Sequence, residues 1–223
     1  MLGFVPYPQP TRFGGIGGRV TMNKAHWENV YQSKPVTQVS WFQEHAERSL
    51  QFIRNTGIAQ DAHIMDVGGG ASTLVDDLLC DGYSKLTVLD ISVAALLVAR
   101  KRLGPDADKV HWLEADITQA EFPEASVDVW HDRAVFHFLT NPQDRRRYVS
   151  NVLRAVKPGG HVIIATFAED GPLRCSGLDI VRYRPDSLHD EFGEAFKLVA
   201  SDQEVHHTPG GADQKFIYCY CRR

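Results

Sequence analysis

Hydrophobic positions of this 223-residue chain recur at two spacings, one typical of helices and one typical of buried strands. From Trp41, apolar residues return every three or four positions with charged residues between them, which predicts a helix that ends near Gly57. The apolar run of residues 62–67 predicts a strand, glycines follow it at 68–70, and a second helical pattern covers residues 74–79. This segment is therefore predicted to be strand, glycine loop and helix.

The same order of elements continues along the chain. Further strands are predicted over residues 86–89, 110–113, 127–130 and 161–167. Between them we expect helices over residues 93–103, with Ser92 as N-terminal cap, and from Asn141-Pro142 to Val156, where Lys157-Pro158-Gly159-Gly160 ends the helix. Alternating strands and helices predict a mostly parallel sheet that is covered by helices on both faces.

The C-terminal part has a different pattern. Two strand-like runs, Phe196 to Val199 and Lys215 to Cys221, are separated by the polar stretch Ser201 to Gln214, in which no helix fits. We expect these runs to pair as an antiparallel hairpin, which gives an α/β sheet of seven strands. With no internal repeat and no second core, residues 22–223 are predicted to form one domain, and the Gly/Pro-rich residues 1–21 a mobile leader or extension.

Composition narrows the classes of function. Hydrophobic residues make up 43% of the chain and no apolar run approaches the roughly 20 residues that cross a bilayer, so we expect a cytoplasmic protein with no membrane partner. The net charge of -4 gives no electrostatic support for a nucleic-acid partner. The four cysteines lack zinc-binding spacing, so no metal is expected. We expect a monomer or a weak homodimer.

Acidic and glycine residues stand where predicted strands end. Asp66 precedes the loop Gly68, Gly69 and Gly70, and glycines let the backbone approach a ligand while the next helix presents free N–H groups. Ligands of open α/β sheets bind outside the carboxyl ends of the strands, where this loop lies. The third glycine of a dinucleotide-binding motif is absent, because Thr73 occupies its place.

Two further acids favour an adenosine ligand. Asp90 ends the second strand, beside Ile91, where its carboxylate can accept hydrogen bonds from both ribose hydroxyls. Asp116 ends the third strand, where it can accept from the adenine amino group while Ile117 covers the ring. Nicotinamide enzymes share the acid at the end of the second strand but do not usually have the one at the end of the third strand.

These motifs together resemble a known family. The segments Asp66-Val67-Gly68-Gly69-Gly70, Asp90, Glu114-Ala115-Asp116 and Lys157-Pro158-Gly159-Gly160 look like the successive signature motifs of class I methyltransferases, over about residues 25–223. The resemblance implies a Rossmann-like sheet whose last two strands form the hairpin, and S-adenosylmethionine as methyl donor. One departure is Ser72, where many members have a third glycine.

Weaker similarities concern the acceptor. Trp130, Asp132 and Arg133 are similar to the Trp-Asp-Arg-Gly segment of thiopurine-type methyltransferases, and the Asn-Pro-Pro-Tyr segment of many DNA and glutamine amide methyltransferases is absent. Residues 26–31 and 39–42 resemble the lid of a broad bacterial methyltransferase group and, more distantly, lysine methyltransferases of elongation factor. The thiopurine-like segment favours a small-molecule acceptor at sulfur, oxygen or nitrogen, with a protein lysine or a non-catalytic donor-binding module as alternatives.

The resemblance makes several side chains candidates for catalysis or for binding the donor or the acceptor. His137 is the first candidate for a general base and His131 the second, unless His131 contacts the methionine part of the donor. Arg133 could pair with the donor's carboxylate or with an anionic acceptor. Trp41 is expected to shield the donor, whereas Cys175 and Tyr183 are expected near the acceptor.

Overall fold

The computed structural model describes residues 22–223, so the predicted leader at residues 1–21 lies outside the described part. The helices are α1 (Met22–Ser33), α2 (Glu47–Asn55), α3 (Leu74–Cys80), α4 (Val93–Leu103), α5 (Pro142–Ala155) and α6 (Pro185–Asp190). The strands are β1 (His63–Val67), β2 (Lys85–Asp90), β3 (Val110–Glu114), β4 (Val127–Arg133), β5 (Val156–Phe167), β6 (Arg174–Cys175), β7 (Leu178–Asp179), β8 (Lys197–His207) and β9 (Asp213–Arg222).

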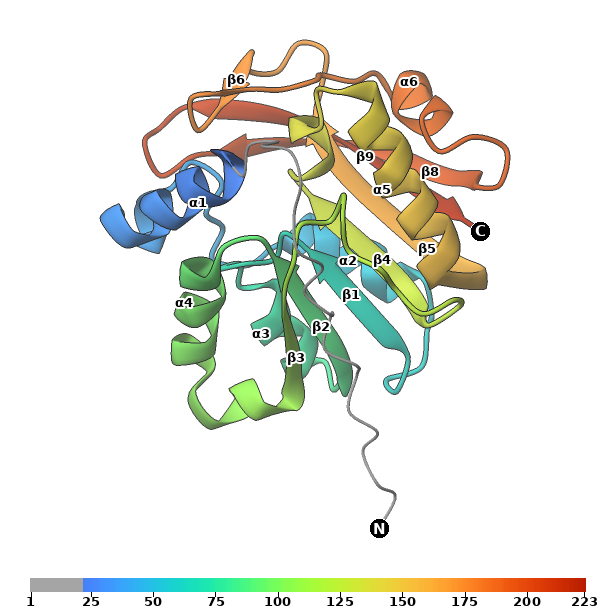
Figure 1. Ribbon diagram of the computed structural model, residues 1–223, viewed down its shortest axis with the longest axis horizontal. Coiled ribbons are helices and arrows are strands. Elements are labelled where there is room, and N and C mark those ends of the chain that lie inside the picture. The colour runs from blue at the N-terminus through green and yellow to red at the C-terminus, as the bar shows by residue number, and fades with distance from the viewer. Residues whose placement is uncertain (1–21) are drawn as a thin grey trace, which may run out of the picture.

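A seven-stranded sheet runs through the molecule in the order β3-β2-β1-β4-β5-β9-β8 (Figure 1). Strands β1 to β5 pair in parallel, whereas β9 pairs antiparallel with β5 and β8 antiparallel with β9. This confirms the predicted Rossmann-like sheet with its antiparallel C-terminal hairpin. A separate two-stranded hairpin, β6 with β7, follows β5 and was not predicted.

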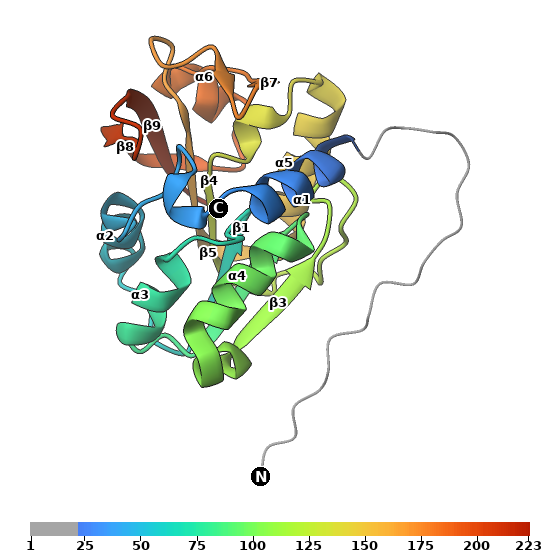
Figure 2. The ribbon, with the colours of Figure 1, turned by 90° about the vertical axis from the view of Figure 1, so that its left-hand side faces the viewer.

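Helices cover both faces of the sheet, and each face has its own core. One core includes Ile53 of α2, Leu74 of α3 and Leu96 of α4, and the other includes Tyr148 of α5 and Leu188 of α6. Figures 1 and 2 show α2, α3 and α4 on one side of the strands and α5 on the other. Because both faces are buried, the central strands are apolar along most of their length.

Two helix starts follow from capping side chains that the sequence indicates. The Ser92 hydroxyl accepts a hydrogen bond from the Ala95 amide at 3.1 Å, at the start of α4. The Asn141 side chain accepts from the Gln143 amide at 2.9 Å, with Pro142 in the first helical position of α5. Both helices therefore begin where the sequence predicts.

Two predicted boundaries are wrong. The helix expected from Trp41 begins only at Glu47, and Trp41 lies in a turn before it, where its indole N–H donates to the Tyr31 hydroxyl at 3.1 Å. The helix α5 ends at Ala155, and residues 157–160 belong to β5 rather than to a turn before it.

The C-terminal hairpin is longer than predicted. Strand β8 continues through residues 201–207, which were expected in the connection, so only residues 208–212 turn between the strands. Since β8 is the edge strand, few of its side chains are buried, and it carries exposed polar residues such as Ser201 and Gln203 without cost. Because residues 201–207 are mostly polar, the hydrophobic pattern of the sequence did not predict them as part of a strand.

The buried hydroxyl of Tyr148 provides a test of this core. It donates to Asp132 at 2.6 Å and accepts from the Trp130 indole at 2.9 Å, and all three side chains are fully buried. Tyr148→Phe leaves a buried carboxylate and a buried N–H short of a partner, so we expect the free energy of unfolding to fall by about 1–3 kcal/mol. Urea denaturation measures it, and an unchanged midpoint would contradict this role for the hydroxyl.

Candidate functional site

A cavity of about 320 Å³ opens at the carboxyl ends of the parallel strands, where open α/β sheets bind ligands. One end lies against β1, β2 and the loop after β3, and is lined by Gly68, Asp90, Ile91, Ala115, Asp116 and Ile117. The other end lies against β4, β5 and β9, and is lined by Arg133, Phe138, Phe167, Cys175, Gln214 and Phe216. Strand ends distant in sequence therefore share one cavity.

The glycine loop after β1 is packed too closely for side chains. A Cβ atom on Gly68 would overlap Val135, and Gly68 has a φ of +69°. A Cβ atom on Gly69 would overlap the Asp66 carboxylate, and one on Gly70 would lie 2.5 Å from Asp90 Oδ2. The loop backbone is thereby held against both carboxylates, an arrangement that fits the close approach of an adenosine-containing ligand.

Asp90 is placed for the predicted ribose contact. Its Oδ1 accepts from the Ser92 amide at 2.8 Å, its Oδ2 lies on the side of Gly70, and its side chain lines the cavity. Burial raises the pKa of the Asp90 carboxyl to about 7. The hydrogen bond from the Ser92 amide lowers this pKa, whereas the negative charges of Asp66 and Glu28 raise it further. A ligand that donates hydrogen bonds to this carboxylate would relieve that cost.

Asp116 and Ile117 line the same end of the cavity, as predicted for the adenine. The Asp116 Oδ1 accepts from the amide and the hydroxyl of Thr118, at 2.9 and 2.7 Å, and its Oδ2 accepts from the Gln119 side chain at 2.8 Å. Each carboxylate oxygen can accept more than one hydrogen bond, so Asp116 retains capacity for a ligand. Thr118 and Gln119 also line the cavity and were missed from the sequence.

A smaller cavity of about 60 Å³ adjoins the large one. The two share the residues Tyr31, Trp41, Gly68 and Arg133. Polar groups of Ser49, Asp66, Ser72 and His131 line the small cavity, together with Gly69. This small cavity has polar and charged groups, set among apolar ones, that could bind the amino-acid tail of the donor. It brings together Trp41, Asp66, His131 and Arg133, which the sequence predicted separately.

Arg133 is the cation between the two cavities. Its Nη2 donates to Glu204 Oε2 at 3.3 Å, and its guanidinium carbon lies 4.2 Å from the centre of the Phe216 ring. The side chains of Arg133 and Glu204 are only 10% and 13% exposed. The charge of Arg133 is therefore partly balanced within the protein, and its position is fixed by both contacts.

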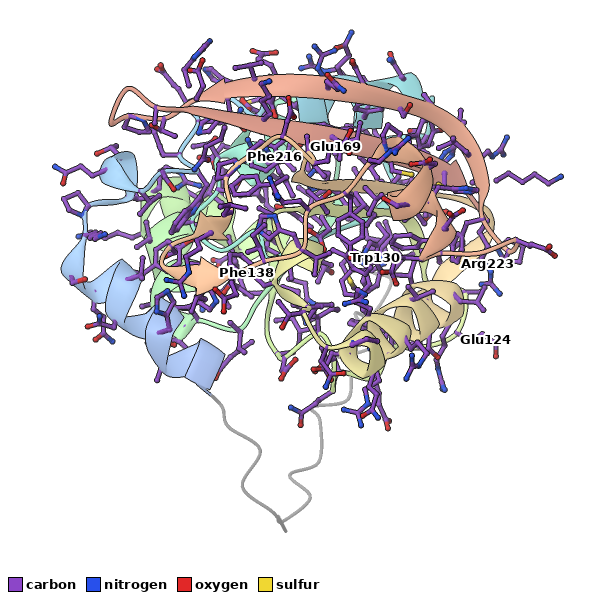
Figure 3. The ribbon with its side chains drawn as sticks, turned by 90° about the horizontal axis from the view of Figure 1, so that it is seen from above. Glu124, Trp130, Phe138, Glu169, Phe216 and Arg223 are labelled. Atoms are coloured by element: carbon purple, nitrogen blue, oxygen red, sulfur yellow. The ribbon has the colours of Figure 1, made fainter. Side chains whose placement is uncertain are left out.

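Aromatic side chains dominate the end of the cavity away from Asp90. Figure 3 views the molecule from above, with Phe138 and Phe216 near the middle and Glu124 and Arg223 at the margin. Cys175, predicted at the acceptor site, lines this end, and burial raises the pKa of its thiol to about 12, so the thiol stays neutral. The contributions of Phe138, Phe167, Gln214 and Phe216 were missed.

Two predicted acceptor-site residues do not line the cavity. His137 is fully buried in a 3-10 turn (Phe136–Phe138), where its Nδ1 accepts from the Phe167 amide at 3.3 Å. Burial, and then the charge of Arg133, lower the pKa of His137 to about 3. Tyr183 is buried against Phe136, with ring centres 5.8 Å apart. The sequence placed both in the right region, but packing turns them into the core.

Helix α1 lies next to α4 (Figures 1 and 2) and contributes Trp27 and Tyr31 to the wall of the cavity. The Glu28 carboxylate accepts from the amides of Val93 and Ala94 at 2.7 and 3.1 Å, which caps α4 from outside the helix. At the other side, His26 is hydrogen-bonded to Ser176 of the β6–β7 hairpin at 3.1 Å. Helix α1 thus joins the donor side to the acceptor side.

Other kinds of site find no support in the described residues. Between residues 22 and 223, no group of three or more His, Cys, Asp and Glu side chains could hold a metal ion. Cys219 and Cys221 lie on one face of β9, buried, with their sulfurs 3.5 Å apart. None of the helices described is long and apolar enough to cross a membrane.

Comparison with known proteins agrees with this geometry. Residues 65–164 match the family model described as "Methyltransferase domain". The solved 1,6-didemethyltoxoflavin-N1-methyltransferase of Burkholderia thailandensis, with bound S-adenosylhomocysteine, superposes with a TM-score of 0.66 at 17% identity, over 91% of this chain and 84% of its own.

Two curated relatives have different acceptors in their names. The mouse eEF1A lysine and N-terminal methyltransferase is 24% identical over 87% of this chain, and the demethylmenaquinone methyltransferase of Clavibacter sepedonicus is 31% identical over 52%. The chain spans only 30% and 46% of the lengths of these relatives.

The fold, the glycine loop and its strand-end acids agree with the similarity of residues 65–164, somewhat under half of the chain, to a methyltransferase domain. The likeness to the solved methyltransferase shows that the chain shares its fold. The residues present fit S-adenosylmethionine, because three close-packed loop positions and two strand-end acids leave room and hydrogen-bonding capacity for it.

The pKa of Asp90 makes donor binding depend on pH. Ribose hydroxyls donate to the ionised carboxylate, so below about pH 7 binding must also release a proton. We expect the affinity for S-adenosylhomocysteine to rise with pH, by at most about tenfold per unit, and to level off above about pH 7. Calorimetry across this range measures it, and Asp90→Asn should bind weakly with a flat profile. A wild-type profile as flat as that of the variant would remove Asp90 from the ribose contact.

Proposed function

We propose that this protein transfers the methyl group of S-adenosylmethionine to sulfur, oxygen or nitrogen of a small molecule held at the aromatic end of the cavity. The observation that carries the proposal is the enclosure of this end. Trp27 of α1 contacts Trp41 and Phe138 with ring centres 5.5 and 5.2 Å apart, and His26 joins the same helix to the β6–β7 hairpin. An enclosed aromatic chamber fits a compact acceptor.

S-adenosylmethionine, when bound, supplies a methyl group already activated by positive sulfur. The chain's own residues then have to hold the acceptor in line with that group and exclude water. The aromatic side chains Trp27, Tyr31, Trp41 and Phe138 are placed to do both. The donor's carboxylate has Arg133 as a partner between the two cavities.

The acceptor end offers no strong base among the residues described. Burial keeps the thiol of Cys175 and the hydroxyl of Tyr31 protonated, because it raises both pKa values, and His137 lies outside the cavity with a lowered pKa. The acceptor must therefore attack through a lone pair or a group that ionises by itself. Thiols, phenols of low pKa and amines meet this requirement.

A protein lysine is the second candidate. It is favoured by the similarity to the mouse eEF1A methyltransferase over 87% of this chain, and an aromatic wall can hold a cationic side chain. Against it, Glu204 lines neither cavity and is paired with Arg133, and the Oδ1 of Asp144, which lines the large cavity, lies 3.6 Å from Nη1 of Arg147. A donor-binding module without activity is a third candidate, disfavoured by the presence of the glycine loop together with its strand-end acids.

A labelled-donor screen separates these candidates. The protein would be incubated with S-adenosylmethionine carrying a labelled methyl group, against a panel of thiols, phenols, carboxylates and amines and against a cell lysate. We expect the label in small molecules. Label in protein alone would replace the proposal with the lysine candidate, and no transfer despite donor binding would favour the module. Gly69→Val is the control, because its side chain would overlap Asp66.

The place of His137 in the core predicts the effect of replacing it. His137→Asn removes a buried ring and its hydrogen bond with Phe167, so we expect a loss of stability of about 1–3 kcal/mol. The turnover per folded molecule, with an acceptor found in the screen, should stay within about twofold at every pH. A loss of about 10²-fold that shrinks as pH rises would instead restore His137 as the general base.

A further inference from the structure

A chain of hydrogen bonds connects the floor of the glycine loop to the acceptor end of the cavity. Its members, named here the buried relay, are in order Asp66, His131, Ser49, Tyr218, Glu204 and Arg133. The successive contacts measure 2.7, 2.8, 3.2, 3.2 and 3.3 Å. The relay crosses β1, β4, α2, β9 and β8, and the first four members are at most 4% exposed.

The relay contains fewer protons than contacts when His131 is neutral. Each of the four contacts between Asp66 and Glu204 needs one proton, and carboxylates that form ion pairs with His131 and Arg133 supply none. Ser49 and Tyr218 supply one each, and a neutral imidazole supplies one more. Burial raises the pKa of Tyr218 to about 12, so its hydroxyl keeps that proton. One buried contact would therefore place two lone pairs against each other.

We propose that His131 carries a proton on both ring nitrogens and that this imidazolium is a positioning residue of the methyl-transfer site. Its Nδ1 then donates to Asp66 and its Nε2 to Ser49, Ser49 donates to Tyr218, and Tyr218 donates to Glu204. Every contact of the buried relay is filled. The inference rests on the proposed function, because both ends of the relay, Asp66 and Arg133, line the small cavity proposed for the donor's tail.

The charges of the surroundings agree with this protonation. With an imidazolium, two carboxylates and two cations balance within the buried relay, whereas a neutral ring leaves one buried negative charge uncompensated. The next residue on β4, Asp132, is fully buried, which raises its pKa to about 6, and the charge of His131 lowers that pKa. At neutral pH its carboxylate is a further negative neighbour that favours a positive ring. The nearby cation Arg133 opposes a positive ring, and Glu204 is bonded to that cation.

The relay has consequences at both ends. Asp66 lies directly beneath Gly69, so its orientation sets the floor of the glycine loop. Glu204 is held by Tyr218 and by the Gln43 amide at 2.8 Å, and it fixes Arg133 over Phe216. Removal of the Tyr218 hydroxyl should therefore weaken binding of the donor's tail, although Tyr218 lines neither cavity.

Nitrogen NMR of the histidine rings tests the proton count without any substrate. In the uniformly labelled full chain at about neutral pH, we expect both nitrogens of His131 to show the shifts of an imidazolium. The signal is assigned by its loss in His131→Gln or, if that variant does not fold, by contacts of its ring protons with Ser49. Tyr218→Phe removes two contacts and one proton, so the Ser49 proton and one ring proton fill the two contacts that remain, and the ring should become neutral. A neutral ring in the wild type would overturn the proposal.

Donor affinity tests the positioning role, with a matched control on the same strand. Tyr218→Phe should weaken S-adenosylhomocysteine binding by about tenfold, the scale of one charge-assisted hydrogen bond. Tyr220→Phe, two residues along β9, removes a hydroxyl bonded to His161 at 2.6 Å outside the relay and should leave the affinity unchanged. Equal affinities for wild type and Tyr218→Phe would overturn the positioning role. If the wild type binds no S-adenosylhomocysteine, the proposed function fails, while the NMR result still decides the proton count.

Discussion

The close packing of the glycine loop against two buried carboxylates is the constraint on which the rest of the site depends. Positions 68, 69 and 70 accept only hydrogen as a side chain, because Val135, Asp66 and Asp90 occupy the space of a Cβ. That packing fixes where the donor can lie. The cost is a carboxyl group at Asp90 whose pKa is raised to about 7 by burial, which a ligand with ribose hydroxyls can relieve.

The donor side could be predicted from the sequence because its determinants are local. A strand, a glycine loop and an acid at a strand end occupy adjacent positions, so the pattern alone places Asp66, Asp90 and Asp116 at one edge of the sheet. The sheet itself follows from alternating strands and helices for the same reason. Strand β8 is the exception, since an edge strand needs no continuous apolar run.

The acceptor side could be predicted only in part, because it is assembled from segments far apart in the chain. Phe216 and Gln214 of β9 reach the cavity through the antiparallel pairing of β9 with β5, and Phe138 through a 3-10 turn after β4. The spacing of residues along the sequence does not predict contacts between segments that are so far apart in the chain. Cys175 was found because the loop after the fifth strand covers the acceptor in this fold, but Tyr183 from the same region packs into the core.

The histidines show how burial decides between chemical roles that the sequence leaves open. His131 and His137 are six residues apart and both are almost fully buried, yet their surroundings differ. His137 meets aromatic rings, a backbone amide and the charge of Arg133, which disfavour a positive ring. His131 meets a carboxylate and a hydroxyl that are joined to a second carboxylate, which favour one. With His137 held neutral in the core and His131 held in an ion pair, neither ring is available to remove a proton. The site then acts by aligning its reactants, and the acceptor must lose its own proton.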